Sequence, residues 1–202
     1  STAKIQGNLY YHSDGTVKTA TGTSITGMQL DDKDAELDAV AATAMNAMRH
    51  AADLRHTFFT PPNIELGRNQ NFTATGTPGE TVVLKLGNFV LSGNSTFTLE
   101  GTAGTTFIIN VDKKFSLAGN ASIVLGSDVQ WGNVLFNICG KNGAVSLAGS
   151  SRFAGILMAN RRTIHITNSA NVTGEVIANR VMLSSKTFNG DANVGNPSVV
   201  SQ

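Results

Sequence analysis

Ionisable side chains are the first candidates for chemistry, and they do not converge in this sequence. Beyond residue 101 the acids are Asp112, Asp128, Glu175 and Asp191, and no two of them share a position in the repeats described below. Polysaccharide hydrolases and lyases need paired carboxylates or clustered acids with bases. A carbohydrate-active enzyme is therefore the weakest of the functions we consider, and we expect no catalytic residues.

The histidines and the single cysteine do not suggest a metal site. His12, His50, His56 and His165 are scattered, without the short spacings of metal ligands. Cys139 has no second cysteine to pair with, and it follows an apolar stretch that predicts an inert, buried thiol. We expect neither a metal nor a cofactor.

Neutral polar residues take the place that charges hold in most soluble proteins. Charged residues make up 14% of the 202 residues, whereas about 25% is usual. The sequence instead holds 22 Thr, 19 Asn and 16 Ser, and its net charge is +1. This balance argues against a nucleic-acid partner. The sequence also has no run of about 18 apolar residues, so we expect no membrane insertion.

The sequence divides into three parts, which we expect to form a single domain over residues 1–202. Residues 1–30 are polar and predict a short N-terminal β portion. Residues 31–56 open with acids, close with bases and carry apolar residues at spacings of three and four, which predicts a helix. Residues 63–190 predict stacked coils.

A repeated motif identifies the coils. Apolar residues two apart are followed by small turn residues, and one apolar position recurs at separations of 26, 30, 19 and 17 residues: Leu91, Leu117, Leu147, Ile166 and Leu183. Such repeats are typical of solenoids. We therefore predict a mainly β fold, a right-handed parallel β-helix of triangular cross-section with one long α-helix packed alongside.

One wall of this solenoid is expected to lie under the helix. Nearly continuous apolar runs, such as Phe107–Val111 and Val134–Ile138, predict strands buried on both faces. The helix offers the apolar stripe to cover them, so we place it over Ile108, Leu135, Leu157 and Ile177.

The other two walls alternate between apolar and small polar residues. One turns outward a row of hydroxyl and amide residues, interrupted by Val124 and Arg152: Thr96, Thr98, Ser122, Asn171 and Thr173, with Thr187 at the end. The other turns out Ser92, Ser116, Ser146, Thr167 and Ser184, and the sequence does not choose between the two. Thr73–Thr77 contains glycine and predicts a loop edge, and the basic pairs Lys113-Lys114 and Arg161-Arg162 predict solvated corners.

The layout resembles the microbial ice-binding proteins that combine a right-handed β-solenoid with a companion helix, and related secreted bacterial surface domains. The similarity is carried by three stretches: Phe107-Ile-Ile-Asn-Val111, Ser151-Arg-Phe-Ala-Gly-Ile-Leu-Met-Ala159 and Ala170-Asn-Val-Thr-Gly-Glu-Val-Ile-Ala178. The resemblance implies a non-enzymatic protein that adsorbs to ice.

The row from Thr96 to Thr187 is then the expected ice-binding face. A flat, weakly charged β-wall holds the hydroxyl and methyl of Thr in a fixed rotamer. The expected partner is the surface of an ice crystal, met outside the cell by a secreted monomer. The alternative is a non-catalytic extracellular module that binds glycan or protein.

Overall fold

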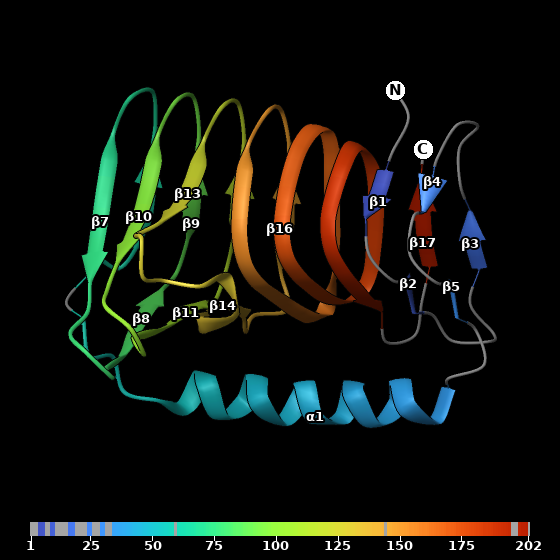
Figure 1. Ribbon diagram of the computed structural model, residues 1–202, viewed down its shortest axis with the longest axis horizontal. Helices are drawn as coiled ribbons and strands as arrows, with labels where there is room; N and C mark the ends of the chain where they lie inside the picture. Colours follow the sequence, from blue (N-terminus) through green and yellow to red (C-terminus); the bar gives the residue numbers. More distant parts are fainter. Residues whose placement is uncertain are drawn as a thin grey trace.

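The computed structural model describes residues 4–6, 9–10, 16–18, 24–25, 29–30, 34–58, 60–143, 145–194 and 198–201. Its strands form a parallel β-solenoid with one helix alongside, which confirms the predicted fold class (Figure 1). In the first coils each strand pairs with the third strand further along the chain, as β8 does with β11 and β11 with β14. Each coil therefore contributes one strand to each of three walls.

We name the walls by their strands. Wall A contains β8 (Thr81–Leu86), β11 (Thr106–Val111) and β14 (Val134–Ile138). Wall B contains β6 (Ile64–Leu66), β9 (Phe89–Leu91), β12 (Phe115–Leu117) and β15 (Val145–Leu147). Wall C contains β7 (Asn71–Thr75), β10 (Thr96–Glu100) and β13 (Ser122–Leu125). β16 (Arg152–Val194) pairs in turn with β13, β14 and β15, and so continues all three walls.

The beginning of the chain stacks on its end. The strands involved are β1 (Lys4–Gln6), β2 (Leu9–Tyr10), β3 (Thr16–Lys18), β4 (Ser24–Ile25), β5 (Gln29–Leu30) and β17 (Ser198–Ser201). β1 and β2 pair in parallel with β16, and β3 pairs with β17. β4 and β5 then stack on β1 and β2. The helix starts from this end and runs back along the coils (Figure 1).

Apolar side chains fill the inside of the coils. Phe89 and Phe115 are fully buried, and their rings stack with centroids 5.4 Å apart. Phe136 meets both rings edge-on, at 5.4 and 5.6 Å. The aligned positions Leu91, Leu117, Leu147 and Ile166 are also fully buried, which confirms the phase predicted from the repeat.

The helix is shorter than predicted. α1 spans Asp34–Asp53, so residues 54–56 lie beyond it, while residues 31–33 are outside the described part of the chain. The chain leaves the helix to join the edge of wall A, where the Thr57 N–H donates to the Val83 carbonyl at 3.0 Å. The Thr57 hydroxyl also donates to the Thr81 carbonyl at 3.2 Å. Within the described residues, no helix is long and apolar enough to cross a membrane.

A column of polar side chains anchors the helix to wall A. Lys85, Asn110 and Asn137 stand opposite one another on successive strands. Their nitrogens donate to helix carbonyls: Lys85 Nζ to Ala52 at 2.8 Å, Asn110 Nδ2 to Ala51 at 2.7 Å and Asn137 Nδ2 to Met48 at 2.9 Å. The Ala51 and Ala52 carbonyls lie in the last helical turn and lack intrahelical donors. Asn110 and Lys85 therefore cap the helix, and the Asn137 bond to Met48 adds a third attachment to the wall.

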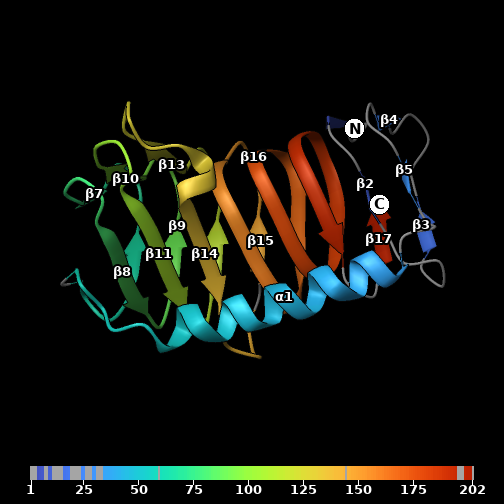
Figure 2. The ribbon, with the colours of Figure 1, turned by 60° about the horizontal axis from the view of Figure 1, so that its bottom comes forward.

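Apolar contacts complete the interface and correct one expectation. Leu135 and Ile177 pack against a cluster of helix residues Ala44 and Met48 with Met158 of β16, and both were predicted to lie under the helix. Leu157 does not face the helix, because it is fully buried inside the coils. The register pairs Leu135 with Ile156 and Phe136 with Leu157, so Ile156 and Met158 point toward the helix instead. Figure 2 shows the helix lying across this wall.

We predict that Asn137→Ala lowers the free energy of unfolding by about 1 kcal/mol, because it removes the buried Nδ2 group that donates to the Met48 carbonyl and to Asn110 Oδ1. Asn69→Ala is the matched control, since Asn69 is an exposed asparagine that also takes part in a side-chain hydrogen bond. Urea unfolding followed by circular dichroism gives both values. Equal effects of the two variants would show that Asn137 does not anchor the helix.

Candidate functional site

Wall C presents an array of hydroxyl and amide side chains. Parallel pairing places Thr96 opposite Ser122, and Thr98 opposite Val124. Neighbouring strands lie about 4.8 Å apart and alternate residues about 6.7 Å apart, so the outward side chains form a regular two-dimensional lattice. The structure thus brings Thr96, Thr98 and Ser122 together as predicted from the sequence.

The array begins one coil earlier than the sequence indicated. Thr73 was expected in a loop, but it lies in β7, directly opposite Thr98. Asn71 likewise stands opposite Thr96. The alternation of Phe72 and Ala74 with these polar residues was the available signal, and the glycine at position 76 obscured it. Asn71 and Thr73 therefore extend the array at its exposed end.

The later coils continue the same columns. The Asn171 N–H donates to the Ser151 carbonyl at 2.8 Å, which places Asn171 opposite Arg152. Thr173 follows two residues later and is exposed on the same wall. Thr187 belongs to β16, but its side chain lies outside the part of the chain whose side chains are described.

Two residues interrupt the array. Val124 is 43% exposed and sits between Thr98 and the next coil. Arg152 is exposed beside Ser122 and carries the one charge in its column between Asn71 and Asn171. Glu100 stands opposite Thr75, near the end of wall C that leads to wall A. The backbone spacing of wall C is therefore regular, but its outward side chains include apolar and charged residues as well as hydroxyls and amides.

The hydroxyls of walls B and C differ in their hydrogen bonding. On wall B the hydroxyls of Ser116 and Ser146 bond to each other at 3.0 Å, and Ser92 Oγ donates weakly to the Leu66 carbonyl at 3.4 Å. On wall C the Ser122 hydroxyl donates to the Asn120 carbonyl at 3.3 Å, while no described side chain or carbonyl bonds to the hydroxyls of Thr96 or Thr98. The threonine hydroxyls of wall C are therefore available to water.

An asparagine ladder stiffens the corner between walls B and C. Asn120 Nδ2 donates to Asn94 Oδ1 at 2.9 Å, and Asn94 Nδ2 donates to Asn69 Oδ1 at 3.1 Å. The glycines beside them stack closely, because a Cβ added at Gly119 would lie 2.9 Å from the Gly93 carbonyl oxygen. Gly119 also has φ of +71°, which favours glycine. These corners hold the strands of wall C in register.

One of the basic corner residues is buried rather than solvated. Arg162 was expected at a solvated turn, but it is 5% exposed. Its guanidinium donates to the carbonyls of Gly140 at 2.7 Å, Lys113 at 2.6 Å and Asp112 at 3.3 Å. Burial lowers the pKa of Arg162 from its usual value. The side chain joins successive coils and is not a surface charge.

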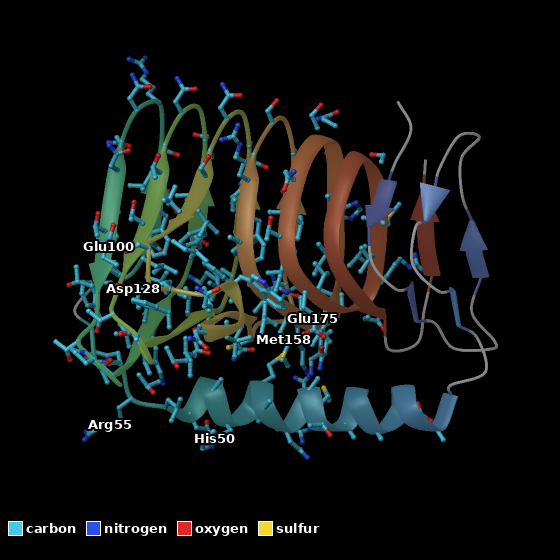
Figure 3. The ribbon with its side chains drawn as sticks, in the orientation of Figure 1. His50, Arg55, Glu100, Asp128, Met158 and Glu175 are labelled. Atoms are coloured by element: carbon cyan, nitrogen blue, oxygen red, sulfur yellow. The ribbon has the colours of Figure 1, made fainter. Side chains whose placement is uncertain are left out.

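The described residues do not assemble a metal site or a reactive nucleophile. No group of three His, Cys, Asp or Glu residues among them could hold a metal ion. His50 and Arg55 point away from the coils (Figure 3). Burial, followed by the nearby Asp112 carboxylate, raises the pKa of the Cys139 thiol to about 11. The thiol is therefore protonated at physiological pH.

Family comparison agrees with this architecture. The model of a family described as "Putative Ice-binding-like adhesive domain" matches residues 1–190. The chain belongs to this family. No curated protein matches the sequence. Membership therefore rests on a match that spans the N-terminal strands, the helix and the coils of the ice-binding-like adhesive domain.

Solved structures of ice-binding proteins share its fold. One is an ice-binding protein from the Antarctic ascomycete Antarctomyces psychrotrophicus, with 18% identity and a TM-score of 0.52 over 98% of this chain and 94% of that chain. Another is a glycosylated ice-binding protein from an Arctic yeast, with 16% identity and a TM-score of 0.54 over 100% of this chain and 90% of that chain. At these identities the likeness shows the fold.

We predict that Cys139 reacts with a disulfide reagent such as Ellman's reagent about 100-fold more slowly in the native protein than in urea at pH 8. A pKa raised from 9.0 to about 11 reduces the reactive thiolate by roughly that factor. Absorbance at the thiolate product's band measures both rates. Rapid labelling of the folded protein would contradict the placement of this thiol.

Proposed function

We propose that this domain adsorbs to ice through wall C and inhibits the growth or recrystallisation of ice outside the cell. The observation that carries the proposal is the regular array of available threonine hydroxyls on one wall of a solenoid that belongs to an ice-binding-like family. The proposed contact residues are Thr96, Thr98, Ser122, Asn171, Thr173 and Thr187, joined by Asn71 and Thr73.

The physical basis is a rigid surface that orders water across the whole array, instead of holding a separate hydration shell around each group. Ordered water between two surfaces bonds nearly as well as a direct hydrogen bond, and a fixed β-wall requires little further ordering of side chains on contact. Charges hold their own hydration tightly, and taking them from water is costly. A row of Thr, Ser and Asn avoids most of that penalty.

Hydrogen bonding favours wall C over wall B. Wall B is also flat, and its outward residues are half-buried and small. Its Ser116 and Ser146 hydroxyls are already partners of each other. Thr96 and Thr98 have no such partner among the described residues and combine a hydroxyl with a methyl on the same rigid carbon. Wall A is excluded as a flat surface because the helix covers it.

The proposed setting is extracellular, where ice forms, and the proposed form is a monomer. Adsorption to a crystal needs no second subunit, because one coil stack already presents the whole array. The proposal includes no enzyme activity, and it does not depend on a cofactor.

We predict that Thr98→Tyr raises the concentration needed to block ice recrystallisation by about tenfold, which corresponds to a loss of about 1.4 kcal/mol in adsorption. The bulky ring would stand out from the centre of the array and hold the wall away from ice. Splat-cooling microscopy at a series of protein concentrations gives this value.

Ser146→Tyr is the matched control, because Ser146 is an equally half-buried strand residue on wall B. Full activity in Ser146→Tyr with loss in Thr98→Tyr supports wall C. The reverse pattern would move the ice-binding face to wall B. An inactive wild-type domain would overturn the proposed function altogether.

We predict that Arg152→Thr increases the inhibition of recrystallisation several-fold. The change removes a hydrated charge from the column between Ser122 and Asn171 and inserts a β-branched hydroxyl residue in its place. The same microscopy assay measures it, with the melting temperature as a check on folding. Unchanged or weaker inhibition would show that Arg152 does not disturb the contact.

Adhesion is the second candidate function, because the family description names an adhesive domain. This function requires saturable binding to a glycan or protein on another surface. Screening the purified domain against immobilised glycans and matrix proteins tests it. Binding that survives Thr98→Tyr would separate adhesion from ice contact.

A further inference from the structure

A narrow apolar groove lies between the helix and wall A. Its volume is about 560 Å³, which is within the range of about 300–1,000 Å³ of small-molecule sites. On the helix side it is lined by Ala39, Ala44 and Ala47, and on the wall side by residues such as Leu135 and Ile177. Met158 and Glu175 project into the space between the coils and α1 (Figure 3).

The described helix side chains that line the groove are short. The column of Lys85, Asn110 and Asn137 attaches the carbonyls of Met48, Ala51 and Ala52 to the wall. Further toward the N-terminus, the described lining residues of the helix are alanines and one threonine. Beside the packed apolar cluster that includes Ala44 and Met158, these short side chains leave room for an occupant.

The channel is elongated along the solenoid axis. On the helix it runs from Ala39 to Ala47, a rise of about 12 Å over eight residues. On the wall it runs from Ile108 through Leu135 and Ile156 to Ile177, which is three strand spacings or about 14 Å. Two independent estimates therefore give a length suited to a linear chain rather than a compact ring system.

The lining also restricts the charge of an occupant. Glu175 is the one ionisable residue among the described lining residues, and none of them is basic. The Thr43 hydroxyl already donates to the Ala39 carbonyl at 2.8 Å. Neutral polar groups lie at Thr106 and Asn133. Most of the described lining is apolar, so a carboxylate or phosphate head would lose hydration there with no basic residue among the described lining to replace it.

From this geometry we propose that the groove binds a linear aliphatic chain of about eight to ten carbons that carries an uncharged polar head, such as a fatty alcohol. The chain lies along the solenoid axis between the helix and wall A. This site is separate from wall C and does not depend on the ice-binding proposal.

The protein has a tryptophan beside the groove that can report binding by fluorescence. Trp131 is the single tryptophan of the sequence, is 43% exposed, and directly precedes Gly132 and Asn133, which line the groove. A neutral apolar dye such as N-phenyl-1-naphthylamine absorbs where tryptophan emits. The dye bound in the groove should therefore be excited by energy transfer from Trp131, and the signal should saturate at one dye per protein.

Two filling variants from opposite sides test the location. Ala47→Leu enlarges a helix residue of the lining, and Ile177→Phe enlarges a wall residue. Each is expected to weaken dye binding by about tenfold, while Ala42→Leu, an exposed helix position outside the described lining, leaves it unchanged. Circular dichroism and melting temperature show that each variant is folded. Absence of saturable energy transfer in the wild type, or full binding in a folded filling variant, would overturn the proposal.

Displacement tests the head group. 1-Decanol is expected to displace the dye at a concentration about tenfold lower than decanoate at pH 8, because decanoate must give up hydration of its charge against a mostly apolar lining. Equal potency, or stronger displacement by decanoate, would overturn the uncharged head. Ice recrystallisation inhibition should remain in Ala47→Leu, since wall C is unaltered. Loss of dye binding with retained inhibition therefore separates this site from the proposed function.

Discussion

The packed interior of the coils is the constraint on which the outer surface depends. Phe89, Phe115 and Phe136 are buried against one another across successive coils. A one-residue slip of any strand would turn such rings outward and bring polar residues in. Because the interior tolerates one phase only, residues of the same repeat position must stand in columns outside. The lattice on wall C is thus a consequence of apolar packing inside.

Several polar side chains of this weakly charged chain are buried in the structure. The polar anchors that could have been surface groups are used inside: Asn110 and Asn137 hold the helix, and Arg162 joins three carbonyls of successive coils. Each donates to backbone carbonyls within the structure, where polar groups are usually paired. The outer walls therefore carry mostly neutral residues, while Asn110, Asn137 and Arg162 serve as buried anchors.

Much of the fold could be predicted because the repeated motif indicates both the coils and their inward positions. The spacing of Leu91, Leu117 and Leu147 gave the coils and their inward phase, and the apolar runs indicated the wall beneath the helix. Leu157 was misplaced because it pairs in register with the buried Phe136, which leaves Ile156 and Met158 as the outward residues of that strand. Arg162 was misjudged because its partners are carbonyls of residues 22 to 50 positions away, which no local pattern reveals. The columns of wall C were predictable, and its first row at Asn71 and Thr73 was missed because Gly76 indicated a loop.

The choice between walls B and C depends on how their hydroxyls are hydrogen-bonded, which residue counts do not show. Both walls repeat small hydroxyl residues at the same strand spacing. Across that spacing the short side chains of Ser116 and Ser146 rotate to meet each other at 3.0 Å, so their hydrogen bonds are internal. A threonine in a strand is held by its β-branch, and neither Thr96 nor Thr98 is bonded within the described part of the chain. The methyl group therefore contributes beyond its apolar area, because branching at Cβ restricts the rotamers that the hydroxyl can adopt. A β-wall of threonine offers water an ordered set of donors and acceptors that a β-wall of serine satisfies by itself.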